Sequence, residues 1–101
     1  MERFSVDAYL VDVLMPDLVG HDRRPAAFIV YLFLARQAAK SRRDTVSISL
    51  QTIAVSTGLS KSTVQGAIRH LKRRRLLDPS VTATVRDPLR RVLRPWAEVG
   101  T

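Results

Sequence analysis

Residues 50–71, LQTIAVSTGLSKSTVQGAIRHL, restrict the fold of this chain more than any other segment. Gly58 separates two short helical patterns, and glycine adopts without steric cost the left-handed backbone conformation that a tight turn between helices requires. Ser60 follows two residues later, where its side chain can cap the free amides at the start of a helix. We therefore predict a helix over 50–56, a tight turn, and a second helix over about 61–75.

The second predicted helix has one apolar face. Its members recur at the i, i+3, i+4 and i+7 spacing that places side chains on one side of a helix: Val64, Ala67, Ile68 and Leu71. The small Ala54 lets the first helix cross it closely. This pattern predicts that the second helix packs its apolar face on the rest of the domain.

The opposite face of the same helix carries side chains that form hydrogen bonds. Its outward positions are Lys61, Ser62, Gln65, Gly66 and Arg69. Glutamine pairs bidentately with adenine, and arginine with guanine, in a major groove wide enough to admit a helix. Glycine has no side chain and allows a helix to approach the bases. A helix N-terminus such as that at Ser60 also favours phosphate. We therefore predict that this face contacts DNA.

Positive charge is concentrated in the second part of the chain. Residues 1–60 carry seven Lys/Arg and six Asp/Glu, whereas residues 61–101 carry ten and three, so that +7 of the net +8 lies there. This asymmetry is typical of a protein with one face on a polyanion. Arginines of a hairpin also protect an edge strand from aggregation. Because this hairpin follows the predicted DNA-contacting helix, we expect its arginines to contact DNA as well. The expected contacts come from Arg73 near the end of the helix and from Arg86, Arg90 and Arg91 of the hairpin.

Residues 25–41 predict a helix that is apolar on nearly all sides. Pro25 suits a first helical turn, and Asp22 lies upstream as a candidate N-cap. Such a helix must be covered on several sides, which two short helices and a hairpin do not achieve. We therefore expect part of the cover to come from a second subunit, which predicts a homodimer.

The segment before this helix predicts a shorter one. Apolar residues alternate over 4–10 as in a strand, but those over 6–14 also fit a helical stripe, which favours an extended lead into a helix over about 8–15 that Pro16 ends. A polar loop follows over 17–24. Residues 1–24 are thus expected to be an N-terminal extension and a candidate dimerisation segment.

The remaining segments favour extended structure. Residues 45–48 are β-prone, and residues 81–86 alternate between apolar and polar side chains. A turn signal over 87–89 precedes a second strand candidate over 90–94, which predicts a hairpin. Trp96 is expected to be an anchor of the core.

Residues 50–71 resemble the helix-turn-helix of bacterial transcription regulators, and residues 46–94 resemble its winged form. The small Ala54, the turn Gly58 and the Val64/Ala67 pair match that pattern. The first helix and the segment before it bear a looser likeness to the winged-helix domains of plasmid replication initiators.

The resemblance implies a mainly α fold with a small β-hairpin (α+β), a winged helix-turn-helix. One domain over 1–101 then consists of the extension, a core helix over 25–41, the helix-turn-helix over 50–75 and a wing over 81–94. It also implies that the outward positions of the second helix face the DNA groove.

Other classes of function find no support in the residues. The chain has no cysteine, and its longest apolar run, 26–35, is half the length that a membrane span needs. His21 lies between Asp17 and Asp22 without a recognised ligand spacing. We expect no catalytic residue, metal, cofactor or small-molecule ligand, no signal peptide, and a cytoplasmic, nucleoid-associated protein.

The sequence therefore predicts sequence-specific binding of double-stranded DNA by a homodimeric transcription regulator. Two alternatives stay open. One is a winged-helix adaptor that binds another protein, and the other is the DNA-binding component of a plasmid replication or partition system. The DNA target and the direction of regulation do not follow from the residues.

Overall fold

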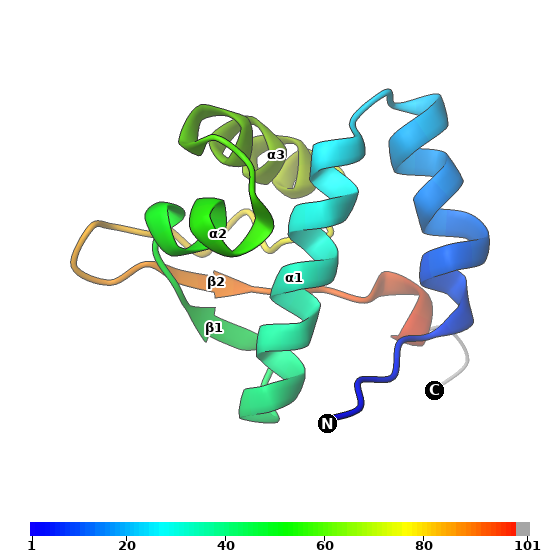
Figure 1. The fold of residues 1–101 in the computed structure, drawn as a ribbon, viewed down its shortest axis with the longest axis horizontal. Coiled ribbons are helices and arrows are strands. Elements are labelled where there is room, and N and C mark those ends of the chain that lie inside the picture. Colours follow the sequence, from blue (N-terminus) through cyan, green and yellow to red (C-terminus); the bar gives the residue numbers. More distant parts are fainter. Residues whose placement is uncertain (99–101) are drawn as a thin grey trace.

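Helix α1, Pro25–Ser41, lies at the centre of the structure, a computed structural model that describes residues 1–98. Helices α2, Leu50–Thr57, and α3, Lys61–Arg73, lie on one side of it, and the N-terminal helical segment lies on the other (Figure 1). Six residues of α1 are buried between these layers: Ala27, Phe28, Val30, Tyr31, Leu34 and Ala38. The chain itself thus supplies much of the cover that the apolar pattern of α1 requires.

The N-terminal segment is helical from Ala8 to His21, and the prediction that Pro16 ends the helix is wrong. It contains two π-helical stretches, η1, Leu10–Leu14, and η2, Pro16–His21. Proline disrupts an α-helix because its ring meets the carbonyl group four residues back. Bonds five residues apart, such as that from the amide of Met15 to the carbonyl of Leu10, give a wider turn that admits the ring.

Burial explains why this segment continues through the proline. Leu10, Leu14 and Leu18 recur every four residues, and all three are buried in the common core. The segment 17–24, predicted as a polar loop, therefore begins as helix and adds Leu18 to the core. η2 ends at His21, and two residues later the backbone of Arg23 is left-handed (φ 55°), which turns the chain towards α1. The amide of Arg24 donates to the carbonyl of Leu18.

The small sheet has two antiparallel strands, β1, Thr45–Ser47, and β2, Leu89–Arg91. Residues 81–86 form no strand, so the predicted pairing within the hairpin is wrong there. The reason is the turn before them: Asp78 accepts from the amide and hydroxyl groups of Ser80, which bends the backbone away from a ladder.

A wing is nevertheless present and comprises residues 77–92. Leu77 forms an antiparallel bridge with Val92 at its base, and at its tip the amide of Thr84 donates to the carbonyl of Asp87 over 3.0 Å. This loop extends away from the helices beyond β2 (Figure 1). The predicted class, a mainly α fold with a small antiparallel sheet, is confirmed.

Trp96 joins the two ends of the described chain. It lies in the short helix η3, Pro95–Glu98, stacks on Tyr9 with ring centroids 4.6 Å apart, and donates from Nε1 to Asp7. It is half-buried and packs against the core, as the sequence predicts. None of the helices formed by residues 1–98 is long and apolar enough to cross a membrane.

Replacing Leu18 by alanine tests whether the N-terminal segment is part of the core. Because Leu18 is fully buried, we expect the free energy of unfolding to fall by about 3 kcal/mol in urea titrations. Val13, an exposed residue of the same segment, is the control, and Val13→Ala should change the free energy of unfolding by less than about 0.5 kcal/mol. A Leu18→Ala protein as stable as the wild type would show that the segment is a detachable extension.

Candidate nucleic-acid interface

The turn between α2 and α3 depends on Gly58. Its backbone is left-handed, with φ 77°, and its amide donates to the carbonyl of Ala54 over 2.9 Å, which closes α2. Residues with a Cβ rarely adopt this conformation. Ala54 is itself buried where the two helices meet. The predicted turn is confirmed, and it sets the direction in which α3 starts.

Ser60 begins α3 as its N-cap. Its Oγ accepts a hydrogen bond from the amide of Thr63 over 3.2 Å and donates to the hydroxyl of Thr63 over 2.8 Å. Ser60 is also exposed at the end of the helix, where the remaining free amides and the helix dipole favour an anion. The capping role is therefore clear, and contact of this helix end with phosphate stays a prediction.

The two faces of α3 differ as the sequence predicts. Val64, Ala67, Ile68 and Leu71 are all buried, with at most 5% of each residue exposed. On the remaining surface, Lys61, Ser62, Gln65, Arg69 and Arg73 are exposed. Among the residues that the structure describes, no carboxylate forms an ion pair with the three cations of this surface. Their charge is available to an external anion.

Gly66 is not required by the packing of α3. A Cβ built there would come no closer than 3.9 Å to another heavy atom, the Nη2 of Arg69, which is an ordinary van der Waals distance. Glycine in the middle of a helix costs about 1 kcal/mol relative to alanine. The residue is thus a local weakness in α3 that intramolecular packing does not explain.

The wing contributes fewer cations than predicted. Arg86 is exposed at its tip. Arg90 is only 6% exposed, its Nε donates to the carbonyl of Ile48 over 3.2 Å, and burial lowers its pKa. Placing Arg90 among the DNA contacts is therefore a misassignment, because alternate residues of β2 point inward and Arg90 is the inward one.

Arg91 is less exposed than Arg86 and less buried than Arg90. Its Nη1 donates to Asp78 over 3.3 Å, and its Nε is 3.8 Å from a carboxylate oxygen of Asp44. The residue is half-buried and holds the base of the wing against the turn before β1. Its ion pair with Asp78 must therefore compete with any contact to DNA.

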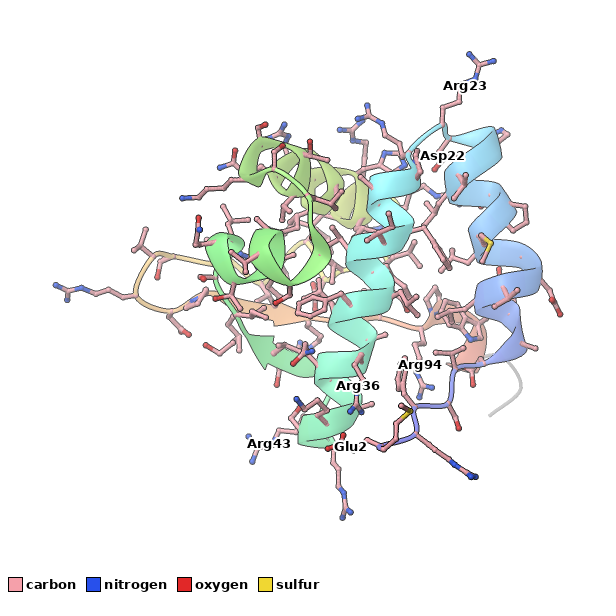
Figure 2. The ribbon with its side chains drawn as sticks, viewed as in Figure 1. Glu2, Asp22, Arg23, Arg36, Arg43 and Arg94 are labelled. Atoms are coloured by element: carbon pink, nitrogen blue, oxygen red, sulfur yellow. The ribbon has the colours of Figure 1, made fainter. Side chains whose placement is uncertain are left out.

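The C-terminal end of α3 is held by carboxylates of η2 and the residue after it. Arg74 pairs with both Asp17 and Asp22, and Nε2 of His70 donates to Asp22 over 2.7 Å. The side chain of Asp22 is only 7% exposed and lies beside the start of α1 (Figure 2). Asp22 does not cap α1, since the N-cap residue is Arg24 and makes no side-chain bond. We call Asp17, His21, Asp22, His70 and Arg74 the anchor cluster.

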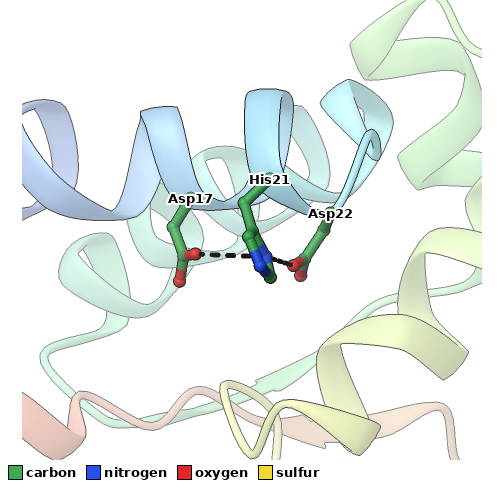
Figure 3. A group of neighbouring side chains, drawn as sticks. All are labelled: Asp17, His21 and Asp22. Carbon is green, nitrogen blue, oxygen red and sulfur yellow. Dashed lines mark hydrogen bonds and ion pairs between the residues drawn. The ribbon is translucent and has the colours of Figure 1, made fainter.

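The anchor cluster lowers the pKa of Asp22 from 3.8 to about 2. The largest cause is the hydrogen bond from His21, burial opposes it, and His70 and Arg74 add to it. Asp17, His21 and Asp22 are close enough for their oxygen and nitrogen atoms to face a common point (Figure 3). The carboxylates of Asp17 and Asp22 already pair with the guanidinium of Arg74, so these three residues function as part of an ion-pair cluster.

Sequence reasoning missed the anchor cluster because its members are far apart in the chain. Asp22 and Arg74 are separated by 52 positions. The only available signal was the contrast between acidic residues near the N-terminus and the basic residues 72–75 at the end of α3.

A two-helix turn with a polar, cationic outer helix, followed by a wing, defines a winged helix-turn-helix, a class that places its second helix on DNA. A family model for the helix-turn-helix domain matches residues 24–77, which are 54 of the 101 residues. The chain belongs to this helix-turn-helix family, and membership indicates DNA binding. The comparisons with curated proteins and with solved structures give no match.

Replacing Asp22 by asparagine tests the anchor cluster. We expect it to destabilise the fold at neutral pH by about 2 kcal/mol, because His70 and Arg74 lose an anionic partner and the lowering of the Asp22 pKa from 3.8 to about 2 corresponds to about that free energy. Since the pKa of Asp22 is lower in the folded state, its contribution is complete above its ordinary value of 3.8 and is lost as the pH falls towards about 2.

The measurement is urea unfolding at several pH values. The difference in the free energy of unfolding between the wild type and Asp22→Asn should disappear across that acid range. The exposed Asp12→Asn control should follow the wild type at every pH. A constant difference between wild type and Asp22→Asn at all pH values would contradict the assignment.

Proposed function

We propose that the protein binds double-stranded DNA in a sequence-specific manner and acts as a transcription regulator, with α3 in the major groove. The observation that carries the proposal is the outer surface of α3. Three of its exposed side chains are cations without an ion-pair partner in the described chain, and Gln65 and Arg69 lie one helical turn apart. Neither burial nor an ion pair among the side chains that the structure describes accounts for these cations.

The side chains divide into two roles. Lys61 and Arg73, near the two ends of α3, suit phosphates on the two sides of the groove, which positions the helix without reading sequence. Gln65 and Arg69 suit the edges of adenine and guanine. Arg86, at the tip of the wing, suits the backbone or a narrow minor groove.

Gly66 supports this orientation of α3. It lies between the two proposed base-reading residues, and the one atom within 4 Å of a Cβ built there is the Nη2 of Arg69, at the end of a flexible side chain. A base or sugar at that place would contact the helix backbone directly, which a methyl group would prevent. The close approach would explain why the helix tolerates its least favourable interior residue.

Replacing Gly66 by alanine separates this role from stability. We expect the free energy of unfolding to rise by about 1 kcal/mol, because alanine favours a helix and meets no clash. DNA affinity should fall by about tenfold or more in fluorescence anisotropy titrations at fixed salt, because the added Cβ blocks the approach.

The control is Ser56→Ala, an exposed position on α2 outside the outer surface of α3. It should leave affinity within about twofold of the wild type. A Gly66→Ala protein that is more stable and binds DNA unchanged would contradict the orientation of α3. Absence of DNA binding by the wild type in moderate salt would instead favour the adaptor hypothesis.

The proposal includes a homodimer, because a single recognition helix covers only one half-site. A candidate surface is the outer side of the N-terminal helical segment. Val11, Met15 and Val19 recur every four residues there and are 50%, 36% and 39% exposed. Such a stripe suits a second copy of the same segment, related by a two-fold axis.

Sedimentation equilibrium tests the dimer. The double substitution Val11→Lys and Val19→Lys should shift the wild-type dimer to monomer, because four like charges would face one another in the symmetric contact. Val55→Lys, on the exposed side of α2, is the matched control and should remain dimeric. A monomeric wild type at high micromolar concentration would rule the dimer out.

A further inference from the structure

A hollow lies at the end of the molecule away from the N-terminus of α1. It is open to solvent and is lined by residues 4–7, by the C-terminal half of α1 and by the segment that follows β2. Its volume is about 460 Å³, within the range of small-molecule sites, and none of its lining residues belongs to α2 or α3. It is therefore separate from the proposed DNA interface.

The floor of the hollow is apolar and well ordered by packing. Leu10, Tyr31, Ala38 and Val92 line it and are each at most 8% exposed. The hydroxyl of Tyr31 donates to the carbonyl of Leu93 over 2.7 Å, which fixes the ring as part of the wall. Alanines at this end of α1, including Ala35, leave room where larger side chains would fill the space.

The rim of the hollow has an excess of positive charge. It carries Arg42, Arg43 and Arg94 against Asp7 and Asp44. Asp7 already accepts from Arg94 and from Trp96, and Asp44 faces Arg91. Neither Arg42 nor Arg43 has an ion-pair partner in the described part of the chain.

Figure 2 shows where two of these arginines, Arg43 and Arg94, lie. Arg94 reaches into the space between the N-terminal segment and α1, and Arg43 lies at the C-terminal end of α1. An apolar floor with unpaired cations at its edge matches a molecule that has an apolar body and a single anionic group. Inorganic phosphate would leave the floor unused, and a neutral hydrocarbon would leave the arginines unused.

We propose that this hollow binds a small amphipathic carboxylate, whose body packs on Ala35 and Val92 and whose carboxylate pairs with Arg42 and Arg43. The site does not depend on the proposed DNA binding. A bound molecule contacts Val92 and Arg94, which directly follow β2 at the base of the wing.

Arg42 offers a substitution that removes charge without straining the fold. Its backbone is left-handed, with φ 56°, where glycine is more favourable than arginine, and its amide caps α1 through the backbone alone. Arg23, with φ 55°, offers the matched control at the opposite end of α1, about 25 Å away by the rise of the helix.

The experiment titrates 2-naphthoate into the full chain, followed by backbone amide chemical shifts and by calorimetry, with neutral 2-naphthamide as the comparison ligand. We expect saturable shifts at Ala35, Ala38 and Val92, and an affinity for the acid about tenfold or more above that for the amide. Arg42→Gly should weaken the binding of 2-naphthoate by about tenfold, and Arg23→Gly should leave that affinity unchanged.

Three results would overturn the proposal. They are no saturable shift in the hollow with 2-naphthoate, equal binding of acid and amide, and equal losses in Arg42→Gly and Arg23→Gly. All readouts are made without DNA, so a failure here is distinguishable from a failure of the proposed DNA binding.

Discussion

The burial of one face of α3 is the constraint on which the proposed interface depends. Val64, Ala67, Ile68 and Leu71 lie in the common core with residues of α1. Burial contributes about 1.5–3 kcal/mol for each of the three large side chains and about 0.8 kcal/mol for the methyl group of Ala67. A helix whose apolar face is fixed in this way cannot rotate about its axis without exposing it. The identity of the outward residues, and therefore the chemistry offered to DNA, follows from that packing.

Both ends of α3 are fixed as well, by different means. At the N-terminus the left-handed Gly58 and the capping Ser60 set its direction. Beyond its C-terminus, Arg74 joins the carboxylates of Asp17 and Asp22, which come from the opposite layer of the fold. The N-terminal segment thus contributes twice, by covering α1 and by holding the end of the helix that presents the interface.

Local features of the sequence predicted the helix-turn-helix well. Gly58, Ser60 and the apolar stripe of α3 each act over a few residues, so their consequences can be derived without knowing the rest of the fold. Pro16, Arg90 and Asp22 were misinterpreted for the opposite reason. Tertiary burial carries the helix through Pro16, pairing of β2 with β1 turns Arg90 inward, and Asp22 meets partners that lie about fifty positions away.

The central claim is that α3 reads base sequence, and selection from a pool of random double-stranded DNA tests it most directly. The account predicts that the wild type enriches a defined motif, and that Gln65→Ala enriches the same motif with one position relaxed, since only that base contact is lost. Failure of the wild type to enrich any motif, or an unchanged motif with Gln65→Ala and with Arg69→Ala, would contradict it.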